Sequence, residues 1–122
     1  MSTYVDGFVL PLPKDKIEQY RAIAEKAAAV WKEHGALEYK ECVADDLDIK
    51  DVVSFRTIAN AGPDETVVFA FIVYNSREHR DEVNAKVMAD PRMNEMGCSE
   101  GEGMPFDCKK MAYSGFKSIV EA

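Results

Sequence analysis

The residues that could do chemistry are polar side chains set in otherwise apolar, strand-like segments of the sequence. A carboxylate enclosed in an apolar cavity would have a raised pKa, and it could then act as a general base on an activated C–H or O–H bond. If the segments converge, the catalytic candidates are Asp6, Glu38 and Asp107. The alternative, which the pattern favours, is that these residues form ion pairs at strand ends or face solvent. For Asp6 itself we expect a solvated or bulged position.

Four further residues are candidates for ligand binding. Lys40 and Lys109 accompany Glu38 and Asp107 and could converge with them in a shared cavity. Arg92 follows the second predicted helix, and Phe106 belongs to the tripeptide Pro105-Phe106-Asp107. Arg92 and the tripeptide could form a ligand site, or they could be a structural clip that holds the long loop between them. The structural clip is at least as well supported by the sequence as the ligand site.

The sequence offers little for a metal site or a nucleophile. His34 and His79 are the only histidines, and neither belongs to an H-x-x-H, H-E-x-x-H or Cys-His cluster. The three cysteines, Cys42, Cys98 and Cys108, are an odd number without a C-x-x-C motif, and no local motif pairs them with a histidine. We therefore expect no metal and no cofactor, and we expect reduced thiols in a cytoplasmic protein.

Size and charge narrow the class of protein. The 122 residues form one predicted domain, 1–122, which is long enough to bury a core without disulfide bonds. Fifteen basic against 22 acidic residues give a net charge of −7, which argues against binding to nucleic acid. The start of the chain does not resemble a signal peptide, and no apolar run approaches the roughly 20 residues that span a bilayer. We expect neither nucleic acid nor a membrane as a partner.

The hydrophobic pattern predicts four strands and two helices. The strongest strand signal is 66–74, which is apolar on both faces and rich in β-branched and aromatic residues. The acidic stretch 45–64 is predicted to be a flexible hairpin tip or a lid, with a short extra strand at Val52-Val53-Ser54-Phe55. The stretch 92–105, rich in Gly and Met, is expected to be an adaptable segment that can cover a pocket. The predicted strands are 4–12, 36–44, 66–74 and 106–116, and the predicted helices are 14–34 and a second that follows the N-cap Ser76 and runs to about Asp90.

The order of these elements predicts an α+β domain with the ferredoxin-like βαββαβ fold. In that fold an antiparallel four-stranded sheet carries both helices on one face. Two helices cannot cover both faces of a strand as apolar as 66–74, so Phe69, Phe71 and Val73 need a second cover. A homodimer that packs sheet against sheet would supply that cover and would enclose a cavity at the interface. The expected partner is therefore a second copy of the chain.

Four ordered segments carry a family likeness: Tyr4–Val9, Trp31–Tyr39, Asn84–Met93 and Met104–Asp107. They resemble the YbaA-like family of uncharacterised bacterial proteins, and the resemblance extends over essentially the whole chain. It implies the dimeric α/β-barrel fold, in agreement with the argument from layers. It implies no function, because the family is a domain of unknown function. The wider superfamily of such barrels includes cofactor-free monooxygenases, haem-degrading enzymes, muconolactone-type isomerases and binding modules.

Two functions fit these observations. The first is a dimeric module without catalytic activity that binds a small apolar or aromatic molecule in its dimer cavity. The alternative is a cofactor-free monooxygenase- or isomerase-like enzyme of the dimeric α/β-barrel type. The enzyme would need a closed cavity lined by Phe, Met and Tyr, with one or two ionisable groups whose removal abolishes turnover. Because no set of residues in the sequence demands catalysis, the binding function is preferred.

Overall fold

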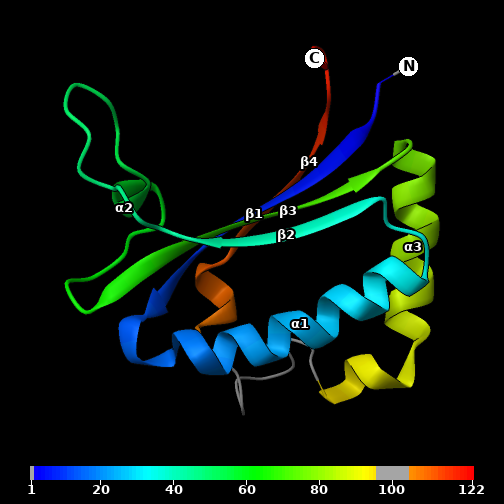
Figure 1. Ribbon diagram of the computed structural model, residues 1–122, viewed down its shortest axis with the longest axis horizontal. Helices are drawn as coiled ribbons and strands as arrows, with labels where there is room; N and C mark the ends of the chain where they lie inside the picture. Colours follow the sequence, from blue (N-terminus) through cyan, green and yellow to red (C-terminus); the bar gives the residue numbers. More distant parts are fainter. Residues whose placement is uncertain (1, 96–104) are drawn as a thin grey trace.

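The computed structural model describes residues 2–95 and 105–122. Its four strands form one antiparallel sheet of order β2-β3-β1-β4 (Figure 1), which confirms the predicted α+β class and the antiparallel four-stranded sheet. The strands are β1 (Tyr4–Pro13), β2 (Glu38–Val43), β3 (Glu65–Tyr74) and β4 (Ala112–Lys117). The helices are α1 (Ile17–Glu33), α2 (Phe55–Ile58) and α3 (Arg77–Ala89), and the 3-10 turns are η1 (Lys14–Lys16), η2 (Pro91–Glu95) and η3 (Cys108–Lys110).

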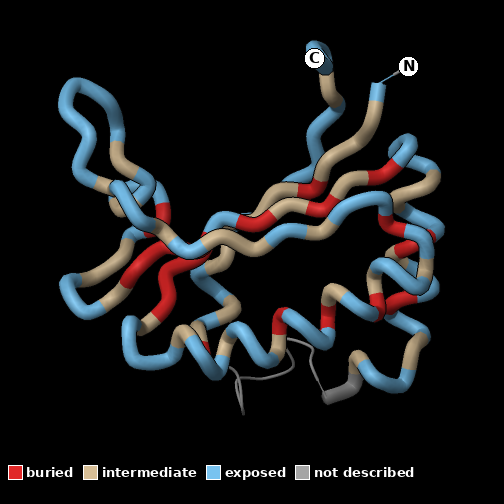
Figure 2. Tube along the Cα trace, in the orientation of Figure 1, coloured by how far each residue is buried: buried red, intermediate tan, exposed pale blue. Residues whose placement is uncertain are grey.

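One face of the sheet forms the core with α1 and α3. Alternate residues of a strand point to the same side, so the even-numbered residues of β1 and β3 share this face. Figure 2 shows many of the buried residues where this face meets the two helices. A single buried cluster joins α1, the end of β3 and α3, so both helices cover the same face. Its residues are Val30, Ala36, Ile72, Tyr74, Val83 and Val87.

The local sequence sets where the two long helices begin and end. The Ser76 hydroxyl accepts the backbone N–H of His79 at 3.0 Å, which confirms the predicted N-cap of α3. Gly35 follows α1 with a φ of 115°, a backbone conformation that glycine tolerates best. α1 begins at Ile17 instead of the predicted residue 14, because Lys14–Lys16 form the separate turn η1.

The opposite face of the sheet, which we call the open face, is not covered by α1 or α3. Phe69 is 42% exposed and Phe116 is 57% exposed there. The ring of Phe116 lies over Gly7, since a Cβ atom at Gly7 would be 3.3 Å from Cε1 of Phe116. Across the four strands, the rows on this face are Glu38–Val73–Val5–Phe116, Lys40–Phe71–Gly7–Ser114 and Cys42–Phe69–Val9–Ala112.

The acidic stretch 45–64 contains a short helix where a strand was predicted. Val52-Val53-Ser54-Phe55 leads into α2, so the predicted extra strand is wrong. The reason is the N-cap: the Ser54 hydroxyl accepts the backbone N–H of Arg56 at 3.1 Å and starts a helical turn. Phe55 then packs edge-on against Phe69 with ring centroids 5.9 Å apart. α2 therefore lies over one end of the open face (Figure 1).

The end of the chain also differs from prediction. The last strand begins at Ala112, because Asp107 caps η3 by accepting the backbone N–H of Lys109 at 3.0 Å. Residues 96–104, most of the stretch predicted to cover a pocket, lie outside the described residues, and so does Cys98.

Cys42 is a free thiol, whereas Cys108 is disulfide-bonded, so the prediction of reduced thiols is wrong at that residue. Disulfide pairing depends on distance in the fold and needs no C-x-x-C motif. The cytoplasmic location stays a prediction.

Within the described ranges, no helix is long and apolar enough to cross a membrane.

Charged side chains join the ends of α1 and α3. Asp90, just after α3, accepts hydrogen bonds from Arg92 Nη2 at 2.7 Å and Arg92 Nε at 3.0 Å. His34 Nε2 lies 2.9 Å from Asp90 Oδ2, and Arg92 Nη1 lies 2.6 Å from Glu33 Oε2 at the end of α1. Arg92 first, and His34 second, hold the pKa of Asp90 well below its ordinary value.

We expect Asp90→Asn to reduce the loss of stability in acid. In the folded protein the pKa of Asp90 lies below its ordinary value of 3.8. The ionised carboxylate therefore stabilises the protein at pH values above 3.8, and this contribution is lost as the pH falls from 3.8 through the lowered pKa. Urea unfolding between about pH 4 and pH 2 should therefore show a shallower decline for the variant. The exposed carboxylate Glu82 provides a control as Glu82→Gln. Equal slopes in wild type and Asp90→Asn would contradict this expectation.

Candidate functional site

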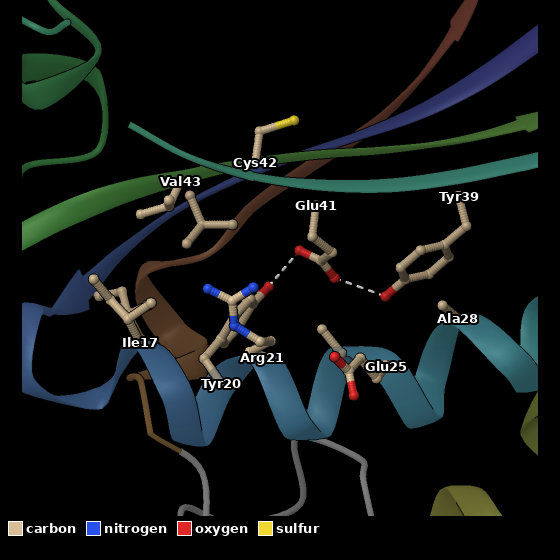
Figure 3. A pocket seen from close by; sticks show the side chains of 12 residues that line it. Ile17, Tyr20, Arg21, Glu25, Ala28, Tyr39, Glu41, Cys42 and Val43 are labelled. Atoms are coloured by element: carbon tan, nitrogen blue, oxygen red, sulfur yellow. Dashed lines mark hydrogen bonds between the residues drawn. The ribbon is translucent and has the colours of Figure 1, made fainter. Parts of the chain in front are cut away.

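A cavity of about 310 Å³ lies between α1 and β2, on the helix side of the sheet (Figure 3). Its volume is at the lower end of the roughly 300–1,000 Å³ usual for small-molecule sites. The side chain of Cys42 points away from it in Figure 3. The lining is mostly aliphatic and aromatic, and its main residues are Ile17, Tyr20, Ala24 and Ala28 of α1 with Tyr39, Glu41 and Val43 of β2.

The spacing of residues on the two elements explains the cavity. Residues three or four apart share a helix face, so Tyr20, Ala24 and Ala28 turn towards the sheet together. Alternation along β2 sends Tyr39 and Glu41 to the same side. The alanine side chains end at Cβ, and they leave room between the helix and the longer side chains of the strand.

Glu41 is the polar centre of the cavity. Its Oε1 accepts a hydrogen bond from the Tyr20 hydroxyl at 2.7 Å, and its Oε2 accepts one from the Tyr39 hydroxyl at 2.7 Å (Figure 3). Burial first, and then the charge of Glu41, raise the pKa of both tyrosines. Both hydroxyls therefore keep their protons at neutral pH and act as donors. The result is a carboxylate held in one position by two neutral partners.

A second, smaller cavity of about 150 Å³ shares this polar group. Tyr20, Ala24, Tyr39 and Glu41 line both cavities, so the three polar side chains form a common wall. The smaller cavity is otherwise apolar and rich in aromatic and sulfur-containing side chains. These include Phe8, Trp31, Met93, Phe106 and Met111.

Asp6 is buried, with 1% of its surface exposed, so the expectation of a solvated position is wrong. Its carboxylate lies 3.0 Å from Arg80 Nη1 and accepts the Tyr113 hydroxyl at 3.0 Å. Arg80 Nη1 also donates to the Tyr113 oxygen at 2.8 Å. Desolvation raises the pKa of Asp6 against the lowering effects of Tyr113 and Arg80. Because the three residues come from β1, α3 and β4, the cluster fastens these elements together.

Glu38 and Lys40 lie on the open face, across the sheet from Asp6. Lys40 Nζ is 3.7 Å from Glu38 Oε1, and both side chains are more than half exposed, at 56% and 51%. Lys40 Nζ also lies 5.9 Å from the centre of the Phe71 ring. Within one chain, the structure does not bring these two residues together with Asp6. Their contact is the ion pair that the alternative interpretation described.

The remaining predicted site residues are dispersed. Asp107 and Lys109 are exposed at η3, and Arg92 belongs to the Asp90 cluster. Phe106 reaches a cavity: it lines the smaller one and packs edge-on against Tyr20 with ring centroids 5.6 Å apart. In the part of the chain that the structure describes, no three His, Cys, Asp or Glu side chains gather as a metal site would require.

The sequence analysis missed Glu41 and its two tyrosine partners as a site. A usable signal was present, because Leu37, Tyr39 and Val43 mark the apolar face of the second strand and Glu41 occupies the same face by alternation. A charged residue on an apolar face is the same signal that singled out Asp6. The contribution of Tyr20 could not be found this way, since it depends on how α1 lies over β2.

We expect Arg80→Ala to destabilise the protein by about 3–5 kcal/mol at neutral pH, because it leaves the Asp6 carboxylate buried without its cation. The loss should shrink as the pH falls towards about 5, since burial raises the pKa of Asp6 and protonation removes the unpaired charge. Urea unfolding at neutral pH and at about pH 5 measures the loss of stability under each condition. Arg77→Ala, at an exposed position of the same helix, is the control. A cost below about 1 kcal/mol at neutral pH would contradict the role assigned to the pair.

Comparison with known proteins identifies the family. The model of the family "Protein of unknown function (DUF1428)" matches residues 3–108 of the chain. The "Uncharacterized protein YbaA" of Escherichia coli strain K12 is 50% identical over 118 residues, which cover 97% of each chain, and YbaA of Shigella flexneri gives the same values. Among solved structures, the de novo designed protein Foldit4 has a TM-score of 0.44 at 8% identity, over 99% of this chain and 100% of that one, which is too low to support an argument. The chain belongs to the DUF1428 family of proteins of unknown function, and YbaA is its relative.

Proposed function

We propose that the protein binds a small, largely apolar molecule with one hydrogen-bonding group in the cavity between α1 and β2. The observation that carries this proposal is the Glu41 carboxylate, held by Tyr20 and Tyr39 at the wall of an otherwise apolar cavity. Ligand sites in proteins combine apolar walls with a few polar groups that fix orientation. This site lies within one chain, whereas the sequence suggested a cavity at a dimer interface.

Binding is favoured over general-base catalysis by the hydrogen bonds of Glu41. Each of its two oxygen atoms already accepts a short bond from a tyrosine hydroxyl that stays protonated. Hydrogen bonds donated to both oxygen atoms weaken the pull of a carboxylate on a substrate proton, but each oxygen keeps a lone pair that can accept a hydrogen bond from a ligand. A carboxylate held in this way is better suited to anchor a ligand. The monooxygenase- or isomerase-like alternative would be supported by turnover of a bound molecule that Glu41→Gln abolishes.

We propose, first, that the chain has the ferredoxin-like arrangement. We propose, second, that it forms a homodimer whose two copies pack through their open faces as a dimeric α/β barrel. The strand order β2-β3-β1-β4, with α1 and α3 on one side, supports the first part. The exposed apolar side chains of the open face support the second, and Phe69 and Phe116 are the largest of them. Extended apolar surfaces on a soluble domain are typical of interfaces. A second copy is the proposed occupant, because the two open faces would present matching apolar rows.

The binding proposal can be tested by filling the cavity. We expect Ala28→Leu to place its added side chain in the cavity and to abolish binding of small aryl probes, because Ala28 lines the cavity wall. Ala29→Leu, one residue along and exposed on the outer side of α1, should leave binding intact. Chemical-shift titration of the wild type and both variants with 2-phenylethanol and 2-phenylethylamine measures the effect. Thermal unfolding of the free proteins shows that both variants fold.

Two outcomes would contradict the binding proposal. The first is that the wild type binds neither probe. The second is that Ala28→Leu and Ala29→Leu bind equally well, which would place the probes elsewhere on the protein.

For the dimer, we expect Phe71→Asp to give a folded monomer. The substitution replaces an aromatic ring of the proposed interface with a carboxylate that would be buried beside Lys40, at a cost on the order of 3 kcal/mol. Light scattering after size-exclusion chromatography reports the mass of each variant. Met88→Asp is the matched control, since Met88 is a 64% exposed apolar residue on α3 in the helix layer. A monomeric wild type, or an unchanged mass for Phe71→Asp, would contradict the sheet-to-sheet dimer.

A further inference from the structure

Among the residues that the structure describes, the Glu41 carboxylate has no cationic partner. Its oxygen atoms accept hydrogen bonds from Tyr20 and Tyr39, and among the described residues no Lys, Arg or His forms an ion pair with it. The two hydroxyls stay neutral because their pKa values are raised. They satisfy the hydrogen-bonding capacity of the carboxylate in part, but they do not cancel its charge. This group therefore presents a negative charge to the cavity.

The other charged residues of the cavity do not reverse that sign. Glu25 on α1 adds a second carboxylate to the lining. Arg21 is the cation of the lining, but its side chain is 60% exposed and its Nε lies 3.0 Å from Glu18 Oε2. Exposed charges that are already paired contribute little to the field inside a cavity. Charge complementarity thus favours a cation as the ligand.

Aromatic rings add to this preference. Tyr20 and Tyr39 line both cavities, and Trp31 and Phe106 line the smaller one. The face of an aromatic ring attracts a cation within about 6 Å of its centre. A carboxylate between aromatic walls is the chemistry that recognises an ammonium group, and the aliphatic wall of Ile17 and Val43 suits an apolar skeleton.

We propose that the site takes a protonated primary amine on a compact aryl or alkyl skeleton. This inference rests on the proposed function, whose ligand class it names. The ammonium group lies against Glu41 and donates to its oxygen atoms beside the tyrosine hydroxyls, and the skeleton fills the apolar part of the cavity. Both an ammonium and a hydroxyl group can donate a hydrogen bond to the carboxylate, but the ammonium group adds the Coulomb attraction of its positive charge. An amine therefore binds more tightly than an alcohol of the same shape, and a carboxylate is repelled.

Three probes of similar shape test the proposal: 2-phenylethylamine, 2-phenylethanol and phenylacetate. For the wild type we expect the Kd of the amine to be at least about tenfold lower than that of the alcohol, with no binding of phenylacetate. Glu41→Gln keeps the size of the side chain but removes its charge, and it replaces one accepting oxygen with an NH2 group that donates to the tyrosine oxygen beside it. This variant should weaken amine binding by about tenfold and change alcohol binding by less than about threefold. Calorimetry or chemical-shift titration at about 0.15 M salt measures both ratios.

Glu82→Gln is the matched control, because it removes an exposed carboxylate of α3 that lines neither cavity. It should change amine binding by less than about threefold. Equal binding of the amine and the alcohol, both lost in Ala28→Leu, would overturn the amine proposal and leave the binding site standing. A preference for phenylacetate would also overturn it. Amine binding that persists in both Glu41→Gln and Ala28→Leu would place the amine elsewhere on this acidic protein and contradict the proposal. Binding of none of the three probes would contradict the proposed function as well.

Discussion

β3 carries large apolar side chains on both of its faces, and one layer of helices can bury only one of them. Ile72 and Tyr74 are enclosed beneath α1 and α3, whereas Phe69 on the other face remains 42% exposed. Burying a large apolar side chain contributes roughly 1.5–3 kcal/mol. The chain therefore gains most of its stability from apolar burial on the helix side of the sheet, and a hydrophobic surface stays exposed on the open face. α2 covers only one end of that surface, through Phe55.

Asp6 of β1 and Glu41 of β2 both lie on the helix side of the sheet, and they differ in whether a cation pairs with them. Asp6 is matched by the guanidinium of Arg80, so its burial fastens α3 to the sheet with little net charge. Within the described ranges, the hydrogen-bond partners of Glu41 are the neutral hydroxyls of Tyr20 and Tyr39. The two carboxylates therefore have different tasks, since a paired charge holds elements together while an unpaired charge beside a cavity can attract a ligand. Asp6, a catalytic candidate from its sequence position, lies in a cluster with Arg80 and Tyr113 that joins β1, α3 and β4.

The elements with strong periodicity could be predicted from the sequence, and contacts between distant residues could not. β1, β3, α1 and α3 follow their hydrophobic patterns, while the predicted strand at Val52–Phe55 is wrong because the Ser54 cap starts a helical turn. Asp6 was misplaced because its partners, Arg80 and Tyr113, lie 74 and 107 residues away along the chain. No pattern within a strand reports such a partner. Glu41 differs, since alternation along β2 could have identified it.

The position of Glu41 also has an energetic consequence. A charge that is partly removed from water without a counterion destabilises the folded state, and an apolar residue at the same place would avoid that cost. A fold selected for stability alone gives no reason for a carboxylate here. A cation bound at Glu41 would offset the cost, and binding to the folded state alone would add about 2.7 kcal/mol of stability at a ligand concentration of 100 times Kd. The tyrosines keep the carboxylate in place in the empty cavity, so little reorganisation is needed when a ligand enters. On the proposed function, the charge of Glu41 would slightly lower the stability of the free protein and favour the complex with a cationic ligand.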